Sequence, residues 1–230
     1  MSKIHRIKQL LQEEGVEFRP PKLLSFFGIF LVFIKLFRRH IFLHKSTIYL
    51  LEMPLMYRDL NINMVAQRFT TIEPLLLFAR EREIQDTQWH GRSYVSELKE
   101  RFERGDQCFA LESDKKIISV IFVSRKSCPI KAVDYILILP EKTVGLYDVY
   151  TVPLYRGQGL YTKLFFLCIN ACINSGYDRA WIWIMPHNRV SLAVHNKLGM
   201  NHVIRSISLC QIFGLKWHII KALNMSITDL

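Results

Sequence analysis

The amino-acid sequence predicts a mixed α/β fold, and three observations lead to this prediction. Residues 107–112 and 117–125 are apolar runs joined by a short polar turn, which predicts an antiparallel hairpin. Residues 145–152 form an apolar run typical of a buried strand. A glycine-rich loop, an apolar helix at 160–174 and a second buried strand at 180–185 follow, so this part resembles a parallel β-α-β unit.

The other elements are expected from local start and stop signals. Thr71 can cap a helix that has Pro74 in its first turn, and Gly105 and Gly199 stand where two further helices end. The expected helices cover residues 72–82, 93–104 and 190–198. The further expected strands cover residues 47–51, 62–69, 135–139, 202–210 and 215–222.

Residues 1–45 are expected to form a basic amphipathic helical extension ahead of one domain at residues 46–230. The apolar run at 23–34 is shorter than the roughly 18–20 residues that a membrane-spanning helix needs. The basic residues on one side of this helix are Lys22, Lys35, Arg38 and Arg39. Residues 22–45 can therefore lie on an anionic membrane, dock on a protein partner or pack on their own domain, and the sequence leaves these three alternatives open.

The composition limits the classes of function. Half of the 230 residues are hydrophobic and 22% are charged, so the chain can bury a large core. A net charge of +11 attracts polyanions, or reflects a solvated basic surface. Neither a helix-turn-helix nor aromatic residues interleaved with basic ones are present, so we expect no nucleic-acid partner. The five cysteines lack CxxC and zinc-site spacing, which predicts no metal site and a cytoplasmic location, with peripheral docking at the inner face of a membrane as the alternative.

Residues 155–160 read YRGQGL and place two glycines directly before a helix. A helix N-terminus carries N–H groups without helical acceptors and a partial positive charge, so a glycine loop there can hold an anion, most often a phosphate. Arg156 adds a cation. A dinucleotide loop GxGxxG would need a glycine in place of Thr162, and no Gly-Lys-Ser/Thr of a Walker loop is present, so both familiar phosphate loops are excluded.

A third loop pattern fits better when the flanking segments are included. Arg156, Gly159 and Tyr161 occupy the three positions of the acyl-CoA motif Arg/Gln-x-x-Gly-x-Gly/Ala, with Tyr161 as a departure. Further along, NRVSLAVHNKLGM matches or nearly matches a second signature at Asn188, Ser191, Lys197, Gly199 and Met200. On these residues the chain resembles the GCN5-related N-acetyltransferase (GNAT) superfamily over roughly residues 60–222.

The resemblance implies a GNAT-like acyl-CoA N-acyltransferase fold, with a central, mostly antiparallel sheet whose parallel fourth and fifth strands splay apart. It also implies a CoA-dependent enzyme that transfers an acetyl or longer acyl group to a primary amine by direct attack. An amino sugar, a lipid-linked amine and a peptide amine all remain open as acceptor, and so does a homodimer. The alternative is a catalytically inactive CoA-binding module with a regulatory or docking role, because positions 161 and 195 both depart from the family pattern.

The same resemblance implies which residues bind acyl-CoA. Backbone N–H groups at 157–162 would hold the pyrophosphate, and the exposed backbone at 149–151 would pair with the pantetheine, to which Asn188 would also hydrogen-bond. The residues expected to bind the co-substrate are Val149, Tyr150, Thr151, Arg156, Gly157, Gln158, Gly159, Leu160, Tyr161, Thr162, Asn188 and Ser191.

Two residues are expected to be catalytic. His195 stands where the family has a tyrosine acid, so it can protonate the departing thiolate; it can also be a surface histidine without that role. Asp148 lies in an apolar strand beside the implied thioester, where it can be the general base or a paired structural carboxylate. The alternatives for the base are water and three residues near the site in sequence: Asp134, Glu141 and His187.

Overall fold

The computed structural model describes residues 44–59, 64–85, 93–212 and 215–229. Contacts divide the chain into two units, and the larger one consists of Lys45–Cys210 and Lys216–Leu230. Apart from its last residues, the expected extension at 1–45 lies outside the described residues, and so do nearly all of the docking residues 22–45. Within the described part of the chain, no helix is long and apolar enough to cross a membrane.

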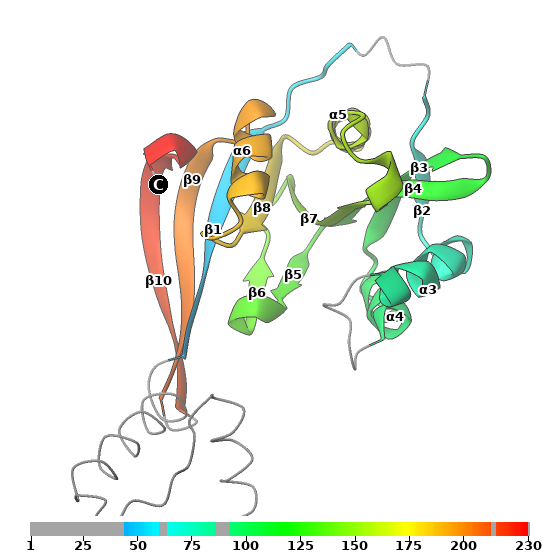
Figure 1. Cartoon of the computed structure of the whole chain (residues 1–230). Helices are drawn as coiled ribbons and strands as arrows, with labels where there is room; N and C mark the ends of the chain where they lie inside the picture. The colour runs from blue at the N-terminus through cyan, green and yellow to red at the C-terminus, as the bar shows by residue number, and fades with distance from the viewer. Residues whose placement is uncertain (1–43, 60–63, 86–92, 213–214, 230) are drawn as a thin grey trace, which may run out of the picture. The chain divides into compact units, whose positions relative to one another are not determined.

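Eight of the described strands form one mixed sheet (Figure 1). They are β1 His44–Pro54, β2 Gln67–Phe69, β3 Gln107–Ser113, β4 Lys116–Ser124, β7 Thr143–Thr151, β8 Arg179–Ile184, β9 His202–Ile212 and β10 Leu215–Ser226. Their order across the sheet is β10-β9-β1-β8-β7-β4-β3-β2. The pairs β1–β8, β2–β3, β3–β4 and β4–β7 are antiparallel, whereas β7 and β8 are parallel. The expected fold class, with its parallel pair inside a mainly antiparallel sheet, is thereby confirmed.

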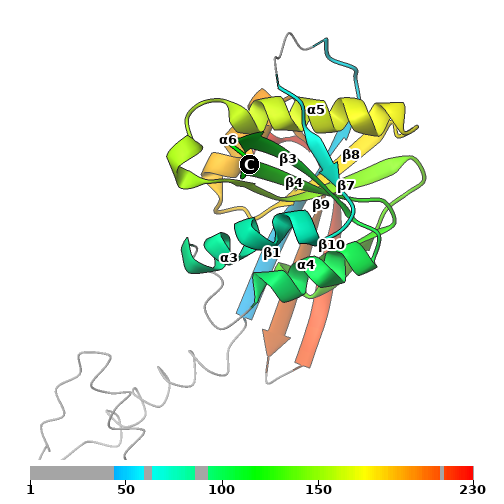
Figure 2. The ribbon, with the colours of Figure 1, turned by 90° about the vertical axis from the view of Figure 1, so that its right-hand side faces the viewer.

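Helices cover both faces of the sheet (Figure 2). They are the 3-10 turn η1 Glu73–Leu75 and the α-helices α3 Leu76–Gln85, α4 Tyr94–Glu103, α5 Leu160–Asn174 and α6 Arg189–Lys197. Strand β3 shows why both faces of the sheet need helices: its apolar side chains alternate between the two faces. Phe109 and Leu111 pack in the core with α5, whereas Cys108 and Ala110 pack in a separate core with α3 and α4.

A small hairpin, β5 Ser127–Ile130 and β6 Tyr135–Ile138, forms a second sheet joined by the 3-10 turn η3 Lys131–Val133. It packs on the main sheet through a third core that includes Trp181. At Gly145 a Cβ atom would lie 2.5 Å from Sγ of Cys128, so only glycine lets β5 approach β7 this closely.

The structure differs from the expected elements in three places, each with a local cause. The expected strand at 62–69 is reduced to β2, and part of it lies outside the described residues. Pro74 lies in a 3-10 turn that begins at Glu73, so α3 begins later than expected and Thr71 is not its cap. Strand β5 was not expected, because a four-residue strand that contains Pro129 has little strand pattern. By contrast, α5 has the expected bounds.

Strand β7 carries the bulge that opens the sheet. Its parallel register with β8 runs from Thr143 to Leu146 and then ends. On the other side, its register with β4 shifts, so that Asp148 and Val149 together face the single residue Ile121. Asp148 has a positive φ of 45°, a left-handed conformation that residues with a side chain rarely adopt. The bulge therefore coincides with the splay between the two parallel strands.

Candidate active site

A pocket of about 620 Å³ lies beside the bulged part of β7, and we call it the loop pocket. Its lining residues are Val149, Tyr150, Thr151, Tyr155, Arg156, Gly157, Gly159, Leu160, Tyr161, Thr162, Asn188, Val190, Ser191 and Val194. The fold thus brings together eleven of the twelve residues expected to bind acyl-CoA, from β7, the glycine loop, α5 and α6. The twelfth, Gln158, is exposed on the same loop but does not line the pocket.

The glycine loop has the backbone that an anion site requires. Gly157 and Gly159 have φ angles of +79° and +69°, and Gly159 is the N-cap of α5. A Cβ atom on either glycine would meet nothing within 4 Å, so backbone conformation rather than lack of space selects glycine here. Since the first N–H groups of a helix have no helical acceptor, the first turn of α5 presents its donors beside the pocket.

Two polar side chains are fixed at the rim of the loop pocket. Arg156 donates from Nε to the carbonyl oxygen of Thr151 at 2.9 Å, and its guanidinium lies 5.6 Å from the ring centre of Tyr150. Asn188 caps α6, because its Oδ1 accepts the N–H of Ser191 at 3.1 Å. The cap uses the amide oxygen of Asn188, which leaves the NH₂ group as the donor that can serve a ligand.

His195 is buried behind Tyr161. It is 4% exposed and does not line the loop pocket, whereas Tyr161 does. Nδ1 of His195 lies 2.7 Å from the carbonyl oxygen of Ser191, which requires a proton on Nδ1. Nε2 then accepts the hydroxyl proton of Tyr161 at 2.6 Å. Burial lowers the pKa of His195 and raises that of Tyr161, so the neutral pair is favoured.

Asp148 lies in a cluster of charges on the other side of β7. Its carboxylate accepts hydrogen bonds from Arg82 at 2.7 and 3.1 Å, from Tyr94 Oη at 2.7 Å, and from Arg101. The side chain is 12% exposed. Burial alone would raise the pKa of Asp148, but the two guanidinium groups outweigh it and hold that pKa far below its usual range. Such a carboxylate stays ionised, and its contacts are those of the paired structural carboxylate that the sequence left as an alternative.

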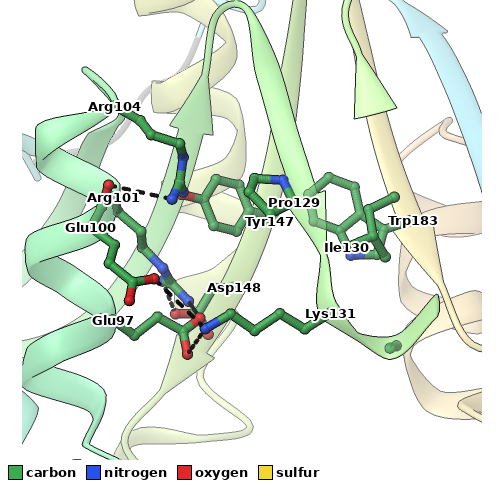
Figure 3. A pocket seen from close by; sticks show the side chains of 11 residues that line it. Glu97, Glu100, Arg101, Arg104, Pro129, Ile130, Lys131, Tyr147, Asp148 and Trp183 are labelled. Carbon is green, nitrogen blue, oxygen red and sulfur yellow. Dashed lines mark hydrogen bonds and ion pairs between the residues drawn. The ribbon is translucent and has the colours of Figure 1, made fainter. Parts of the chain in front are cut away.

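A second cavity of about 220 Å³, which we call the hairpin pocket, lies between α4, the β5–β6 hairpin and the sheet (Figure 3). Its lining residues are Glu97, Glu100, Arg101, Arg104, Pro129, Ile130, Lys131, Ala132, Tyr147, Asp148 and Trp183. The rings of Tyr147 and Trp183 are stacked at 5.5 Å. Because β7 lines this pocket with residues 147–148 and the loop pocket with 149–151, the bulged strand borders both.

Charged side chains meet at the mouth of the hairpin pocket. Lys131 Nζ lies 3.2 Å from one oxygen of Glu97, while Arg101 donates to the other oxygen at 2.6 Å. Lys131 also lies 3.9 Å from Glu100, and both of these side chains are more than half exposed. An ammonium group is therefore already held at this mouth by carboxylates, in a place where it can exchange with solvent.

The remaining base candidates lie elsewhere. Glu141 and His187 are exposed, and Asp134 accepts a hydrogen bond from Lys216 at 2.8 Å. None of the three lines the loop pocket or the hairpin pocket. Sequence reasoning placed Tyr161 in the co-substrate site only; the structure adds that its hydroxyl meets the imidazole of His195. Among the described residues, no group of three or more potential ligands could hold a metal ion.

Comparisons with known proteins bear on the family and the fold of the chain. The family model "Acetyltransferase (GNAT) family" matches residues 75–200. A GCN5-related N-acetyltransferase from Sphaerobacter thermophilus has a similar fold, with a TM-score of 0.50 and 11% identity over 84% of this chain and 57% of that one. No curated protein matches.

Two further structures are similar at lower scores. A GNAT-family structure from Novosphingobium aromaticivorans has a TM-score of 0.49 and 15% identity over 72% of this chain and 63% of that one. The aminoglycoside N-acetyltransferase AAC(6')-Iy, in complex with CoA, has a TM-score of 0.44 and 17% identity over 60% of this chain and 92% of that one. The chain thus spans less than two thirds of two of these three relatives.

Proposed function

Because the chain belongs to the GNAT acetyltransferase family, we propose that it transfers an acetyl or longer acyl group from acyl-CoA to a primary amine by direct attack. One observation carries the proposal: the glycine loop, the bulged backbone of β7 and the cap of α6 line one cavity of about 620 Å³. A phosphate-bearing, elongated ligand suits this combination, since helix N–H groups bind anions and an unpaired strand edge offers backbone donors and acceptors.

Acyl-CoA is placed in the loop pocket as follows. The N–H groups of residues 157–162 bind the pyrophosphate, with Arg156 as the nearest cation. The pantetheine runs along residues 149–151, where β7 has left β8, and the NH₂ group of Asn188 donates to it. The acyl group then lies toward the bulge, next to the hairpin pocket.

The acceptor amine is placed in the hairpin pocket. Glu97 and Glu100 already hold the ammonium group of Lys131 at the mouth, which supports an acceptor that is cationic in solution. The stacked rings of Tyr147 and Trp183 offer an apolar wall for a sugar or aliphatic face. An amino sugar, a lipid-linked amine and a peptide amine all fit this description.

The proton for the departing thiolate is assigned to Tyr161, with His195 behind it. Tyr161 lines the loop pocket, so its O–H can turn from Nε2 of His195 toward a ligand there, whereas His195 is covered. In this step the O–H bond of Tyr161 breaks, an S–H bond forms on CoA, and the phenolate regains a proton from water. Water accepts the proton that the attacking amine releases, because the carboxylate of Asp148 is occupied by its three donors.

The glycine loop provides the test. At the φ of +69° held by Gly159, a valine is strained, so Gly159→Val should shift the first N–H groups of α5 and raise the CoA Kd at least about tenfold in calorimetry. Gly176→Val at the other end of α5 is the matched control, because Gly176 also has a positive φ, +86°, and open space. Circular dichroism checks that both variants fold. Wild-type CoA affinity in Gly159→Val would remove the proposal.

A second candidate, a catalytically inactive CoA-binding module, has one observation in its favour. Asp148 and His195, the two residues expected to be catalytic, are both engaged in buried contacts. Release of free thiol from acetyl-CoA, measured with and without amino sugars and lysine peptides, separates the two functions. Release of thiol from acetyl-CoA that depends on an added amine supports the transferase. CoA binding without thiol release, whichever amine is added, supports the inactive module.

A further inference from the structure

We propose that Asp148 is a positioning residue: clamped by Arg82, Tyr94 and Arg101, it fixes the bulge of β7 and thereby the backbone that receives the pantetheine. This inference rests on the proposed function, because it takes the loop pocket as the CoA site. It assigns α3 and α4, which do not line that pocket, a role in CoA binding.

The bulge needs a restraint of this kind. Asp148 has a φ of +45°, which is unfavourable for a residue with a side chain, and its neighbour Val149 has lost β8 as a pairing partner. An unrestrained strand could slip by one residue into regular pairing with β4, which would exchange the side chains on its two faces. The loop pocket would then lose the backbone arrangement at residues 149–151.

The side chains that hold Asp148, which we call the clamp, are Arg82, Tyr94 and Arg101, and they come from two helices. Arg82 on α3 contacts both carboxylate oxygens of Asp148, and Arg101 and Tyr94 on α4 contact the oxygen Oδ2. Tyr94 also accepts a hydrogen bond from Arg82 at 2.6 Å, so the groups form one connected network. Arg82 and Arg101 are each 4% exposed, and a charge network this deeply buried has few alternative arrangements.

The clamp reaches the loop pocket through Tyr150. The guanidinium of Arg82 lies 4.3 Å from the ring centre of Tyr94 and 4.3 Å from that of Tyr150. Tyr150 lines the loop pocket, and the guanidinium of Arg156 lies 5.6 Å from the same ring. A change at Arg82 therefore acts on the pocket at two points, the bulge and the Tyr150 ring.

The decisive variant is Arg82→Met, which keeps an unbranched side chain among the rings but removes the charge. We expect a CoA Kd at least about tenfold above that of the wild type in calorimetry, because a preorganised binding surface loses its restraint. Arg82→Lys, which restores a cation, should recover part of the affinity. For acyl transfer, KM for acyl-CoA should rise more than kcat falls.

Glu83→Met is the matched control for disturbance of α3. Glu83 is the next residue and ties α3 to α4 through Ser93 and the N–H of Val95, at 3.0 and 2.9 Å. Glu83 also accepts a hydrogen bond from the backbone N–H of Tyr94. It touches none of the side-chain groups that bind Asp148 among the interactions described, so its loss should leave the CoA Kd within about twofold of wild type. The thermal midpoints of both variants then show whether general destabilisation accounts for the difference.

If Arg82→Met does not fold, Tyr94→Phe tests the inference instead, because it removes only one hydroxyl group from the clamp. Hydrogen exchange should then be faster in the peptide that spans residues 147–151, and CoA should bind about two- to threefold more weakly. Wild-type CoA affinity in folded Arg82→Met, or wild-type exchange and affinity in Tyr94→Phe, would overturn the inference. A wild-type protein that binds no CoA would instead remove the proposed function.

A separate comparison distinguishes positioning from base catalysis at Asp148. A general base would make Asp148→Asn lose kcat with an unchanged CoA Kd, and Arg82→Met would leave CoA binding intact. A positioning residue predicts that both variants bind CoA more weakly. Asparagine tolerates a positive φ about as well as aspartate, so Asp148→Asn tests the charge rather than the backbone conformation.

Discussion

Single side chains at this site act in pairs that cross between elements. The hydroxyl of Tyr161 on α5 meets the imidazole of His195 on α6, and the carboxylate of Asp148 on β7 meets guanidinium groups from α3 and α4. Tyr161 lines the loop pocket with His195 behind it, whereas Asp148 and Arg101 both line the hairpin pocket and Arg82 supports Asp148 from behind. The protonation state and charge of a side chain that faces a pocket therefore depend on its hydrogen-bonded neighbour as well as on its residue type.

The sequence could identify most residues around the loop pocket but not these partners. A motif fixes spacing along the chain, which is why the glycine loop and Asn188 could be predicted. It contains no information on contacts between distant segments, such as Arg82 with Asp148, which are 66 positions apart. The departures at positions 161 and 195 were visible, but only the structure shows that the two side chains touch.

Tyr161→Phe should lower kcat about a hundredfold and leave KM for acyl-CoA nearly unchanged, because it removes only the proton donor. The ring keeps its edge contact with Phe165 at 5.9 Å, so packing is preserved. Steady-state kinetics over a range of acyl-CoA concentrations measures both constants. Tyr161→Ala should also lose activity, and Tyr161→Ala combined with His195→Tyr should regain part of it by returning the phenol to position 195. A wild-type kcat in Tyr161→Phe would contradict the assignment.

At the scale of elements, helices and long strands follow from the sequence, while short irregular pieces do not. The bounds of α5 could be predicted because Gly159 and Gly176 stand at its two ends and the residues between them are mostly apolar. Strand β5 contains a proline and depends on contacts with the main sheet, which are not local in sequence. Yet β5 and η3 supply one wall of the hairpin pocket, so the strand that was missed shapes the proposed acceptor site.

Gly145→Ala tests how tightly the hairpin is seated on β7. The new methyl group would lie 2.5 Å from Sγ of Cys128, a distance that requires a shift of β5. We expect the free energy of unfolding to fall by about 1–3 kcal/mol, measured with denaturant. Gly145→Ala combined with Cys128→Ala should be less destabilised than the sum of the two single changes. If the losses of unfolding free energy in the two single variants simply add up in the double variant, the sulfur atom of Cys128 is not what the new methyl group collides with.

At the scale of the whole molecule, the sequence predicted most of the strands of the main sheet but not their order. Strand β1, early in the chain, lies between β8 and β9, and Tyr49 is paired with Ile184. Apolar patterning shows that a strand has a buried face, but it does not identify the neighbour, because pairing depends on packing between distant segments. The family resemblance implied the parallel pair inside a mostly antiparallel sheet, which the structure confirms, but it gave no position for β1.

The net charge of +11 leads to a prediction for the full chain. If residues 22–45 dock on an anionic membrane, Arg38→Glu with Arg39→Glu should weaken sedimentation with anionic vesicles, since each basic group contributes about 1 kcal/mol at such a surface. Binding of the wild type should also fall as salt is added. Acyl transfer to a soluble amine should remain unchanged and serves as the control. Negligible vesicle binding of the wild type at low salt would favour docking on a protein or on the domain itself.

The bulge in β7 also has a consequence for how such a protein can diverge. Neighbouring peptide units of one strand line two cavities, so the proposed donor side and the proposed acceptor side are built from different parts of the chain. Substitutions in α4 or in the β5–β6 hairpin can change which amine is accepted while the glycine loop is kept intact. Natural variation should then be concentrated on the acceptor wall, and a new specificity can arise without rebuilding the site for the donor.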